Sequence, residues 1–274
     1  MISTERIGVE SPNAGSSICR RSNDPHLNGL IRIRSTPFVH RSVTALSGRT
    51  IEVEGTTVID FAHCGYLGVD HDLVEEDISL AKYWGLRNGW SRITGSTQLT
   101  SRLEKELATR LRFPEVRLAQ SISLINLSIF YALNRKFRYF LLERDIHLTL
   151  RNGIQAAATR DGHVQLQWQQ GDLRGLETQL QKLPMDEDKL IAIDGIYSMK
   201  GVCAPVQELV ELCVRYNAVL FIDDAHGFGV EGQNGYGVLE QLLGFEPDRV
   251  IYVGSFSKCT SNPVAFVGFG SSMK

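Results

Sequence analysis

The segment Ser255-Phe256-Ser257-Lys258 places a lysine directly after an apolar run, 250–253, that is typical of a buried strand. In α/β proteins, residues just beyond the carboxyl end of a strand face the crevice where ligands bind. A lysine amine in such a crevice can form a Schiff base with a carbonyl cofactor if its surroundings keep part of it neutral. Most lysines that follow strands are solvated surface groups, so the neighbours of Lys258 decide between the two interpretations.

Polar side chains also follow three other predicted strands. They come after the apolar runs 139–142, 190–193 and 218–222, and they are His147, Ser198, Asp223 and His226. The carboxyl ends of parallel strands meet at one edge of a sheet, so these groups should share a crevice with Lys258. A carboxylate, a lysine, imidazoles and hydroxyls together suit a cofactor with a basic ring nitrogen, a phenolic oxygen, an aldehyde and a phosphate.

The elements that would position these groups alternate between strands and helices. Strands are predicted at 139–143, 190–193, 218–222, 250–254 and 265–270, and helices at 73–83, 100–111, 123–134, 173–183 and 206–216. Thr100 is a possible N-cap, and the short runs 51–55 and 57–61 alternate around Gly55 as a hairpin would. This order predicts an α/β fold of three layers, α/β/α, with a mostly parallel central sheet. Residues 1–48 are expected to form an N-terminal extension, partly disordered or a helical arm, and residues 49–274 one large domain.

The composition is that of an ordinary globular protein, with 43% hydrophobic and 22% charged residues. A net charge of −2 gives no reason to expect a nucleic-acid partner. Five widely spaced cysteines without a CxxC pair argue against a disulfide framework or a zinc site. They fit a reducing compartment, so a cytoplasmic location is expected. No run is long and apolar enough to predict a membrane-spanning segment.

Several motifs surround the predicted strand ends. Residues 223–237 read DDAHGFGVEGQNGYG, residues 194–199 read DGIYSM, residues 66–68 read YLG, and Ser91-Arg92 precede Gly95 and Leu103-Glu104. In these motifs, from about residue 60 to residue 258, the chain resembles the α-oxoamine synthases. These are fold-type I enzymes that depend on pyridoxal 5'-phosphate, and the number of matching positions in order makes chance agreement very small.

The resemblance implies a role for each residue that matches a motif. Lys258 would be the Schiff-base lysine and later the proton shuttle at the substrate Cα, while Asp223 would pair with the ring nitrogen. His226 would bind the phenolic oxygen, with Ser198 near the same side, and His147 would stack on the ring and help to orient the substrate. Asp224 is expected instead to cap the next helix, and Asp172 to have a structural role.

The phosphate of the cofactor would lie against two segments. Ser255 matches a Thr or Ser that binds the phosphate. Ile122, Ser123 and Asn126 lie at the start of a helix whose N-terminus would cradle it. Ile122 stands where the family has glycine, and a β-branched residue resists a positive φ and a close backbone approach. No metal site is predicted.

The resemblance further implies a reaction in which an amino acid condenses with an acyl-CoA to give an aminoketone, in a homodimer. An aminotransferase on the same fold, or a truncated relative without activity, are the alternatives, and His147 favours the synthase because many aminotransferases have an aromatic residue there. Other departures from the family are Lys200 for an acid, Cys64-Gly65 for a polar pair, and residues 259–263 for a glycine-rich stretch. The chain stops at Lys274, just after a predicted strand, so the small C-terminal domain of the family, which supplies a substrate-binding arginine, is expected to be absent.

Overall fold

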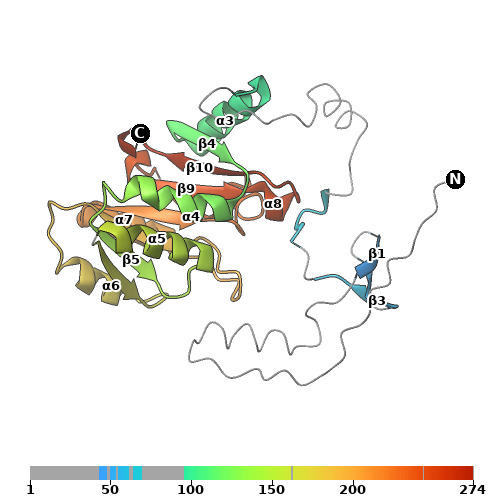
Figure 1. The fold of residues 1–274 in the computed structure, drawn as a ribbon, viewed down its shortest axis with the longest axis horizontal. Coiled ribbons are helices and arrows are strands. Elements are labelled where there is room, and N and C mark those ends of the chain that lie inside the picture. The colour runs from blue at the N-terminus through green and yellow to red at the C-terminus, as the bar shows by residue number, and fades with distance from the viewer. Residues whose placement is uncertain are drawn as a thin grey trace, which may run out of the picture. The chain divides into compact units, whose positions relative to one another are not determined.

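The computed structural model describes residues 43–47, 50–53, 55–61, 64–69, 96–161, 163–242 and 244–273. The chain divides into two compact units, Met1–Asp60 and Phe61–Lys274 (Figure 1). The helix predicted at 73–83, the Ser91-Arg92 motif and most of the predicted N-terminal extension lie outside the described residues. The two units are therefore described one at a time.

The first unit contains a three-stranded antiparallel sheet in the order β1-β2-β3. Its strands are β1 (Val43–Ser47), β2 (Thr50–Val53) and β3 (Thr56–Ile59). The turn between β2 and β3 contains Gly55 at φ +77°, a left-handed conformation that favours glycine. The predicted hairpin around Gly55 is confirmed. β1 was not predicted, because its five residues show no regular alternation of polar and apolar side chains.

The second unit is built on a seven-stranded sheet in the order β4-β10-β9-β8-β7-β5-β6. The strands are β4 (Glu115–Ala119), β5 (Tyr139–Glu143), β6 (Val164–Trp168), β7 (Lys189–Asp194), β8 (Ala218–Asp223), β9 (Val250–Ser255) and β10 (Ala265–Phe269). Neighbours from β9 to β6 pair in parallel, and β10 is antiparallel to both β4 and β9. The mostly parallel sheet is thus confirmed. Two strands, β4 and β6, were not predicted. They are the edge strands of the sheet, and in them apolar residues alternate with polar residues such as Arg117 and Gln165.

Helices cover this sheet. They are α3 (Gln98–Leu111), α4 (Ile122–Leu133), α5 (Leu148–Asp161), α6 (Leu173–Leu180), α7 (Val206–Arg215) and the short α8 (Phe256–Cys259), with 3-10 turns η2 (Gly237–Gln241), η3 (Pro247–Arg249) and η4 (Ser271–Met273). The N-cap of α3 is Thr97, whose Oγ1 accepts a hydrogen bond from the Thr100 N–H at 3.2 Å, so the prediction of Thr100 as the cap was wrong. Asp172 caps α6 through the Gly175 N–H at 2.9 Å, which confirms its structural role.

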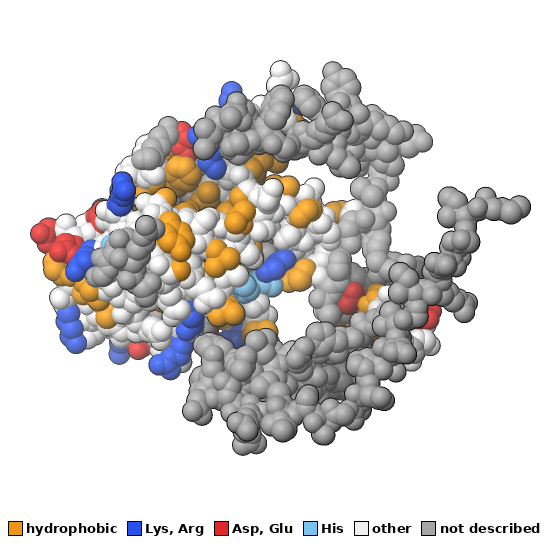
Figure 2. All heavy atoms as spheres, in the orientation of Figure 1, with side chains coloured by type: hydrophobic (Ala, Val, Ile, Leu, Met, Phe, Trp, Pro, Cys, Tyr) orange, Lys and Arg blue, Asp and Glu red, His pale blue; other side chains and the backbone are white. Residues whose placement is uncertain are grey.

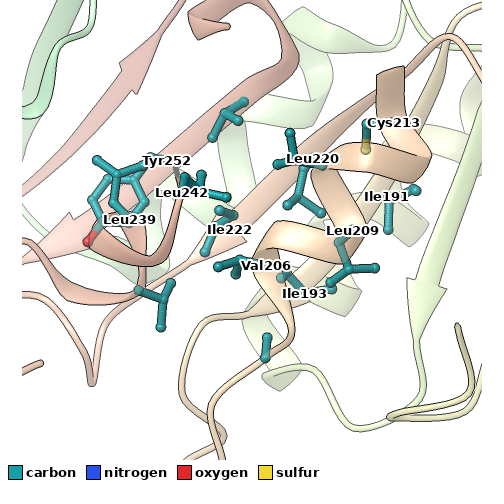
Figure 3. Packing of buried hydrophobic residues seen from close by; sticks show 14 of the residues in the cluster. Ile191, Ile193, Val206, Leu209, Cys213, Leu220, Ile222, Leu239, Leu242 and Tyr252 are labelled. Carbon is teal, nitrogen blue, oxygen red and sulfur yellow. The ribbon is translucent and has the colours of Figure 1, made fainter. Parts of the chain in front are cut away.

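Alternate residues of the buried strands supply two separate apolar layers. Leu141, Ile191 and Leu220 pack on one face with α3, α6 and α7, whereas Phe140, Leu190 and Phe221 pack on the other face with α4 and α5. Figure 3 shows the first layer, in which side chains of α7 lie over those of β7 and β8. Every residue of β7, β8 and β9 is buried. The predicted three-layer α/β/α architecture is therefore confirmed.

The helices α4 and α5 touch at Gly153. A Cβ at Gly153 would lie 1.9 Å from the backbone oxygen of Asn126, so a side chain there would force the helices apart. Glycine permits this close approach because it has no Cβ. The contact fixes the position of Asn126, whose side chain reaches the site described below.

None of the helices in the described ranges is long and apolar enough to cross a membrane. Among the same residues, no group of three or more His, Cys, Asp or Glu side chains could hold a metal ion. The described cysteines, Cys64, Cys203, Cys213 and Cys259, are free thiols, and Cys19 lies outside the described residues.

Candidate active site

A cavity of about 250 Å³ lies at the carboxyl ends of β5, β7, β8 and β9. All the predicted site residues line it except Ser255 and Asn126. Figure 2 shows histidine side chains next to a basic side chain on the surface of the second unit, with apolar side chains around them. The strand ends thus meet as the order of the sheet requires, with β9, β8, β7 and β5 side by side.

Lys258 reaches the cavity from α8, which begins directly after β9 with Ser255 as its N-cap. Its Nζ lies 2.7 Å from Nε2 of His226. Burial lowers the pKa of the Lys258 ammonium, and the nearby Asp223 carboxylate partly opposes this shift. The uncharged amine, which is the nucleophilic form, is therefore populated at a lower pH than in an exposed lysine.

His226 lies between Lys258 and Tyr66. Its Nδ1 is 2.8 Å from the Tyr66 hydroxyl, and the Tyr66 N–H donates to the backbone oxygen of Lys258 at 2.9 Å. Burial, followed by the positive charge of Lys258, lowers the pKa of His226 to about 4. The imidazole is therefore uncharged at neutral pH, with one ring nitrogen donating and the other accepting. A charged Lys258 ammonium can only donate, so Nε2 then accepts from it and Nδ1 donates to the Tyr66 hydroxyl.

Asp223 ends β8 and is 4% exposed. Its Oδ1 accepts the Ala225 N–H at 3.1 Å and its Oδ2 accepts Nδ2–H of Asn126 at 2.6 Å. Burial raises the pKa of Asp223, while these hydrogen bonds and the charge of Lys258 counteract the rise. Asn126 therefore reaches the site by holding Asp223, and it does not line the cavity as predicted for a cofactor-binding residue.

His147 lies just after β5 and before α5, and its side chain lines the cavity. Its backbone N–H donates to both carboxylate oxygens of Asp194, at 3.1 and 3.0 Å. Asp194 lies opposite Asp223 in the register of β7 and β8 and also lines the cavity. It was not predicted as a site residue, although its position at the end of a buried strand, like that of Asp223, was a usable signal.

Asp194 should make the stability of the cofactor-free chain depend on pH. Burial, followed by the charge of Asp223, raises the pKa of Asp194 from 3.8 to about 8. The folded Asp194 keeps a proton that the unfolded chain releases, so its contribution to stability is present below about pH 4 and is lost as the pH rises to about 8. Asp194→Asn should flatten the dependence of the unfolding free energy by up to about 1.4 kcal/mol per pH unit.

Urea unfolding of both chains between pH 5 and pH 8 measures this difference. Glu143, which ends β5, has its pKa raised to about 8 mainly by burial, so Glu143→Gln is a useful comparison that should flatten the same range. Equal slopes for the wild type and Asp194→Asn would show that Asp194 is ionised in the folded chain at pH 5.

The N-terminus of α4 supplies anion-binding groups to the cavity. Ser121 is the N-cap, and its Oγ accepts the Leu124 N–H at 3.2 Å. The next residues, Ile122 and Ser123, line the cavity, and the first N–H groups of a helix have no partner within it and attract anions. The φ angle of Ile122 is not positive. The strain that was expected where Ile122 replaces a glycine is therefore not present. Its backbone simply begins the helix.

The two predicted serines have different positions. Ser198 is exposed, in the turn after β7, and lines the cavity. Ser255 is 1% exposed, and its Oγ accepts the Ser257 N–H at 3.1 Å as the cap of α8. Ser257, which was not predicted, lines the cavity instead. Its spacing from Lys258 gave no signal, because the short helix α8 that turns it toward the cavity was not predicted.

Asp224 does not cap a helix, because η2 begins only at Gly237, so that prediction was wrong. Its buried Oδ2 accepts the Tyr252 hydroxyl at 2.8 Å and the Val238 N–H at 2.9 Å. A Cβ would come within 2.4 Å of its carboxylate at any of three glycines, Gly195, Gly227 and Gly237. These glycines therefore make room for Asp224, which fastens the glycine-rich segment to the sheet.

Two of the departures from the family motifs have a structural account. Lys200 forms an ion pair with Asp145, with Nζ 2.5 Å from Oδ2, and donates to Gln170 Oε1 at 2.6 Å. Ser261, in the segment that replaces a glycine-rich stretch, has φ 57°. This left-handed conformation favours glycine, so Ser261 occupies a position where a glycine would be less strained.

The fold is a three-layer α/β/α domain whose ionisable groups gather at the carboxyl ends of its parallel strands. The chain belongs to the aminotransferase class I and II family, whose profile matches residues 59–271.

Two curated relatives are similar over most of this chain. Serine palmitoyltransferase from Bacteroides ovatus is 30% identical over 236 residues, which are 85% of this chain and 59% of the relative. 8-Amino-7-oxononanoate synthase from Methylobacillus flagellatus is 34% identical over 245 residues, 87% of this chain and 58% of the relative. The chain thus spans a little under 60% of the length of these relatives, and both are α-oxoamine synthases, which confirms the resemblance drawn from the motifs.

Solved structures share the fold. Serine palmitoyltransferase from Sphingomonas wittichii has a TM-score of 0.75 at 24% identity, with 90% of this chain and 61% of that chain covered. A serine palmitoyltransferase solved with pyridoxal phosphate has a TM-score of 0.73 at 24% identity, with 92% of this chain and 65% of that chain covered. These likenesses cover most of this chain and establish the fold class.

Proposed function

We propose that this chain binds pyridoxal 5'-phosphate and belongs to an acyltransferase that joins an amino acid to an acyl-CoA, giving an aminoketone. The observation that carries the proposal is the position of Lys258 Nζ, 2.7 Å from Nε2 of His226 in the cavity that Asp223 also lines. The names of the curated relatives support an acyl transfer reaction. Because the chain spans only part of their length, catalysis and substrates are proposed for the whole protein.

The groups in the cavity fit the parts of this cofactor. Asp223 would pair with the ring nitrogen, since its buried carboxylate would gain from a positively polarised N–H. His226 would bind the phenolic oxygen, and Lys258 would hold the aldehyde carbon covalently. The N-terminus of α4, with the hydroxyls of Ser123 and Ser257, would bind the phosphate. When bound, the cofactor supplies an electron-accepting ring that stabilises negative charge at the amino-acid Cα.

Lys258 would also act as the base at the substrate Cα. Burial lowers the pKa of its amine, so Nζ can accept the Cα proton at a lower pH than the amine of an exposed lysine. His226, uncharged and 2.7 Å away, can exchange a hydrogen bond with Nζ without placing a second positive charge beside it. In the balanced reaction the Cα–H bond breaks, a bond forms between Cα and the acyl carbon, and the CoA thiol leaves with a proton. Where decarboxylation follows, the bond between Cα and the carboxylate carbon breaks, CO₂ leaves and Cα takes up a proton, which gives the aminoketone.

His147 would cover the ring and orient the substrate. The two contacts of its backbone N–H with Asp194 fix where α5 starts, and hence where the imidazole enters the cavity. Many aminotransferases have an aromatic residue at the position of His147. Acyl transfer is therefore the first proposal, and amino transfer is the alternative. The two differ in whether an acyl-CoA is consumed.

A spectroscopic titration tests the proposed function. Purified protein is mixed with pyridoxal phosphate, then with glycine, alanine or serine, each with and without acyl-CoA. We expect an absorption band near the edge of the visible range, a shift of that band with the correct amino acid, and release of CoA thiol only when both substrates are present. An oxo acid formed without acyl-CoA would instead identify an aminotransferase, and the lack of any band would contradict both.

We also propose that the chain forms a homodimer through α4. Leu124, Leu127 and Tyr131 lie on one face of this helix and are 49%, 43% and 47% exposed. An apolar stripe beside a ligand cavity is a common interaction surface. Light scattering should give the mass of two chains for the wild type and of one chain for Leu127→Glu with Tyr131→Glu. The exposed Thr178→Glu in α6 is the control and should remain a dimer, whereas a monomeric wild type would contradict the proposal.

A further inference from the structure

A chain of hydrogen bonds connects the imidazole of His147 with the carboxylate of Asp223. His147 Nδ1 lies 2.8 Å from Oγ1 of Thr149. Nδ2 of Asn126 lies 3.2 Å from the same Thr149 Oγ1 and 2.6 Å from Oδ2 of Asp223. This series of hydrogen bonds therefore runs from the start of α5 through α4 to the end of β8. Its two inner residues, Thr149 and Asn126, do not line the cavity.

The direction of each hydrogen bond follows from the acceptor at one end. An ionised Asp223 oxygen can only accept, so the Asn126 amide must donate one hydrogen to it. The second hydrogen of this amide then points to Thr149 Oγ1, which accepts it. The Thr149 hydroxyl hydrogen is consequently left for Nδ1 of His147. The Thr149 backbone N–H, a pure donor, also reaches this Nδ1, at 3.3 Å.

Both partners of Nδ1 are therefore donors, and Nδ1 must accept. We propose that Thr149 and Asn126 are positioning residues that keep the proton of the uncharged His147 ring on Nε2 and tie this ring to Asp223. This inference deepens the proposed function and rests on it for the role of His147. The imidazole then offers an N–H donor at its remaining nitrogen, so the group that it contacts in the cavity must be a hydrogen-bond acceptor.

The core holds Asn126 in this orientation. Asn126 is fully buried, and its Oδ1 has no hydrogen-bond partner. Rotating the amide would place Oδ1 against the Asp223 carboxylate, so the lost carbonyl contact is the smaller cost. The backbone of Asn126 cannot retreat toward α5, because Gly153 already lies against it. Both hydrogens of this buried amide are thus engaged in hydrogen bonds, and this sets the direction of every hydrogen bond from Asp223 to His147.

Nuclear magnetic resonance of the full chain, labelled with ¹⁵N-histidine and free of cofactor, tests the proposal. Loss of one signal set in His147→Gln assigns the ring, and long-range ¹H–¹⁵N correlations show which nitrogen carries the proton. We expect the Nε2–H form in the wild type at a pH where the ring is uncharged. Thr149→Val should lower the ratio of the Nε2–H to the Nδ1–H form about fivefold, the effect of a hydrogen bond of about 1 kcal/mol.

Two further variants make the result specific. Thr149→Ser keeps the hydroxyl and should restore the wild-type ratio, and Thr178→Val in α6 should leave the His147 signals unchanged. An Nδ1–H form in the wild type, or an unchanged ratio in Thr149→Val, would overturn the proposal. Because no cofactor is present, this outcome is independent of pyridoxal phosphate binding, whose failure would contradict the proposed function alone.

Discussion

Lys258→Ala is expected to abolish covalent attachment of pyridoxal phosphate and to lower kcat/KM of the whole protein. Alanine has neither the amine that would hold the aldehyde carbon nor a base at the substrate Cα. General base catalysis alone contributes about 10²–10⁴-fold, so at least this loss should be measured. The cavity should otherwise persist, because the backbone oxygen of residue 258, which accepts the Tyr66 N–H, remains in place.

Absorption spectra and initial rates, recorded in parallel, measure this effect. Lys258→Arg is an informative second variant, since it keeps a positive charge beside His226 but cannot react with the aldehyde. The exposed Lys182→Ala is the matched control and should keep both the band and the rate. If Lys258→Ala retained the band at the wild-type intensity, another amine would hold the cofactor.

Asp223→Ala should weaken cofactor binding more than any other substitution that leaves Lys258 intact. Removing one partner of a buried, hydrogen-bonded charge pair costs about 2–5 kcal/mol, which corresponds to a loss of about 30- to 5,000-fold in affinity. The substitution also leaves Nδ2 of Asn126 buried without its shorter hydrogen bond, now 2.6 Å. A destabilisation of about 1–3 kcal/mol should accompany the loss of affinity.

Asp223→Asn separates these two effects. Its amide oxygen can still accept from Asn126, although its NH2 group then faces the Ala225 N–H, so the unfolding free energy should fall less than in Asp223→Ala. A neutral amide cannot hold a proton on the ring nitrogen, so affinity and rate should fall nearly as far as in Asp223→Ala. Equilibrium titration with pyridoxal phosphate and urea unfolding measure the two quantities. Equal cofactor affinity in Asp223→Asn and the wild type would contradict a charge-dependent role.

The central strands and the residues that follow them were predictable because their signals are local. β7, β8 and β9 are continuous apolar runs, as strands buried on both faces must be. Lys258, Asp223 and His226 come directly after such runs, and parallel pairing then brings them to one edge. The edge strand β6 and the helix α5 were missed because polar residues such as Gln165 and Asn152 obscure their periodicity.

Properties of a residue that depend on contacts distant in sequence could not be predicted. Asp194 acquires its raised pKa from burial and from Asp223 on the neighbouring strand, and this requires the register of β7 and β8. The hydrogen-bond partners of Asp224, Tyr252 and Val238, lie 28 and 14 residues further along the chain. The local sequence does not reveal these contacts, and Asp224 was therefore interpreted as a helix cap. Such roles depend on the packed structure and not on local sequence.

Peptide mapping of the borohydride-reduced protein tests the central claim most directly. The chain is saturated with pyridoxal phosphate, reduced, digested and analysed by mass spectrometry. The account predicts one phosphopyridoxyl group per chain, located on Lys258 and lost from this position when Lys258→Ala is treated in the same way. Modification spread over exposed lysines, with the same total amount in Lys258→Ala, would contradict the assignment of Lys258 as the residue that holds the cofactor.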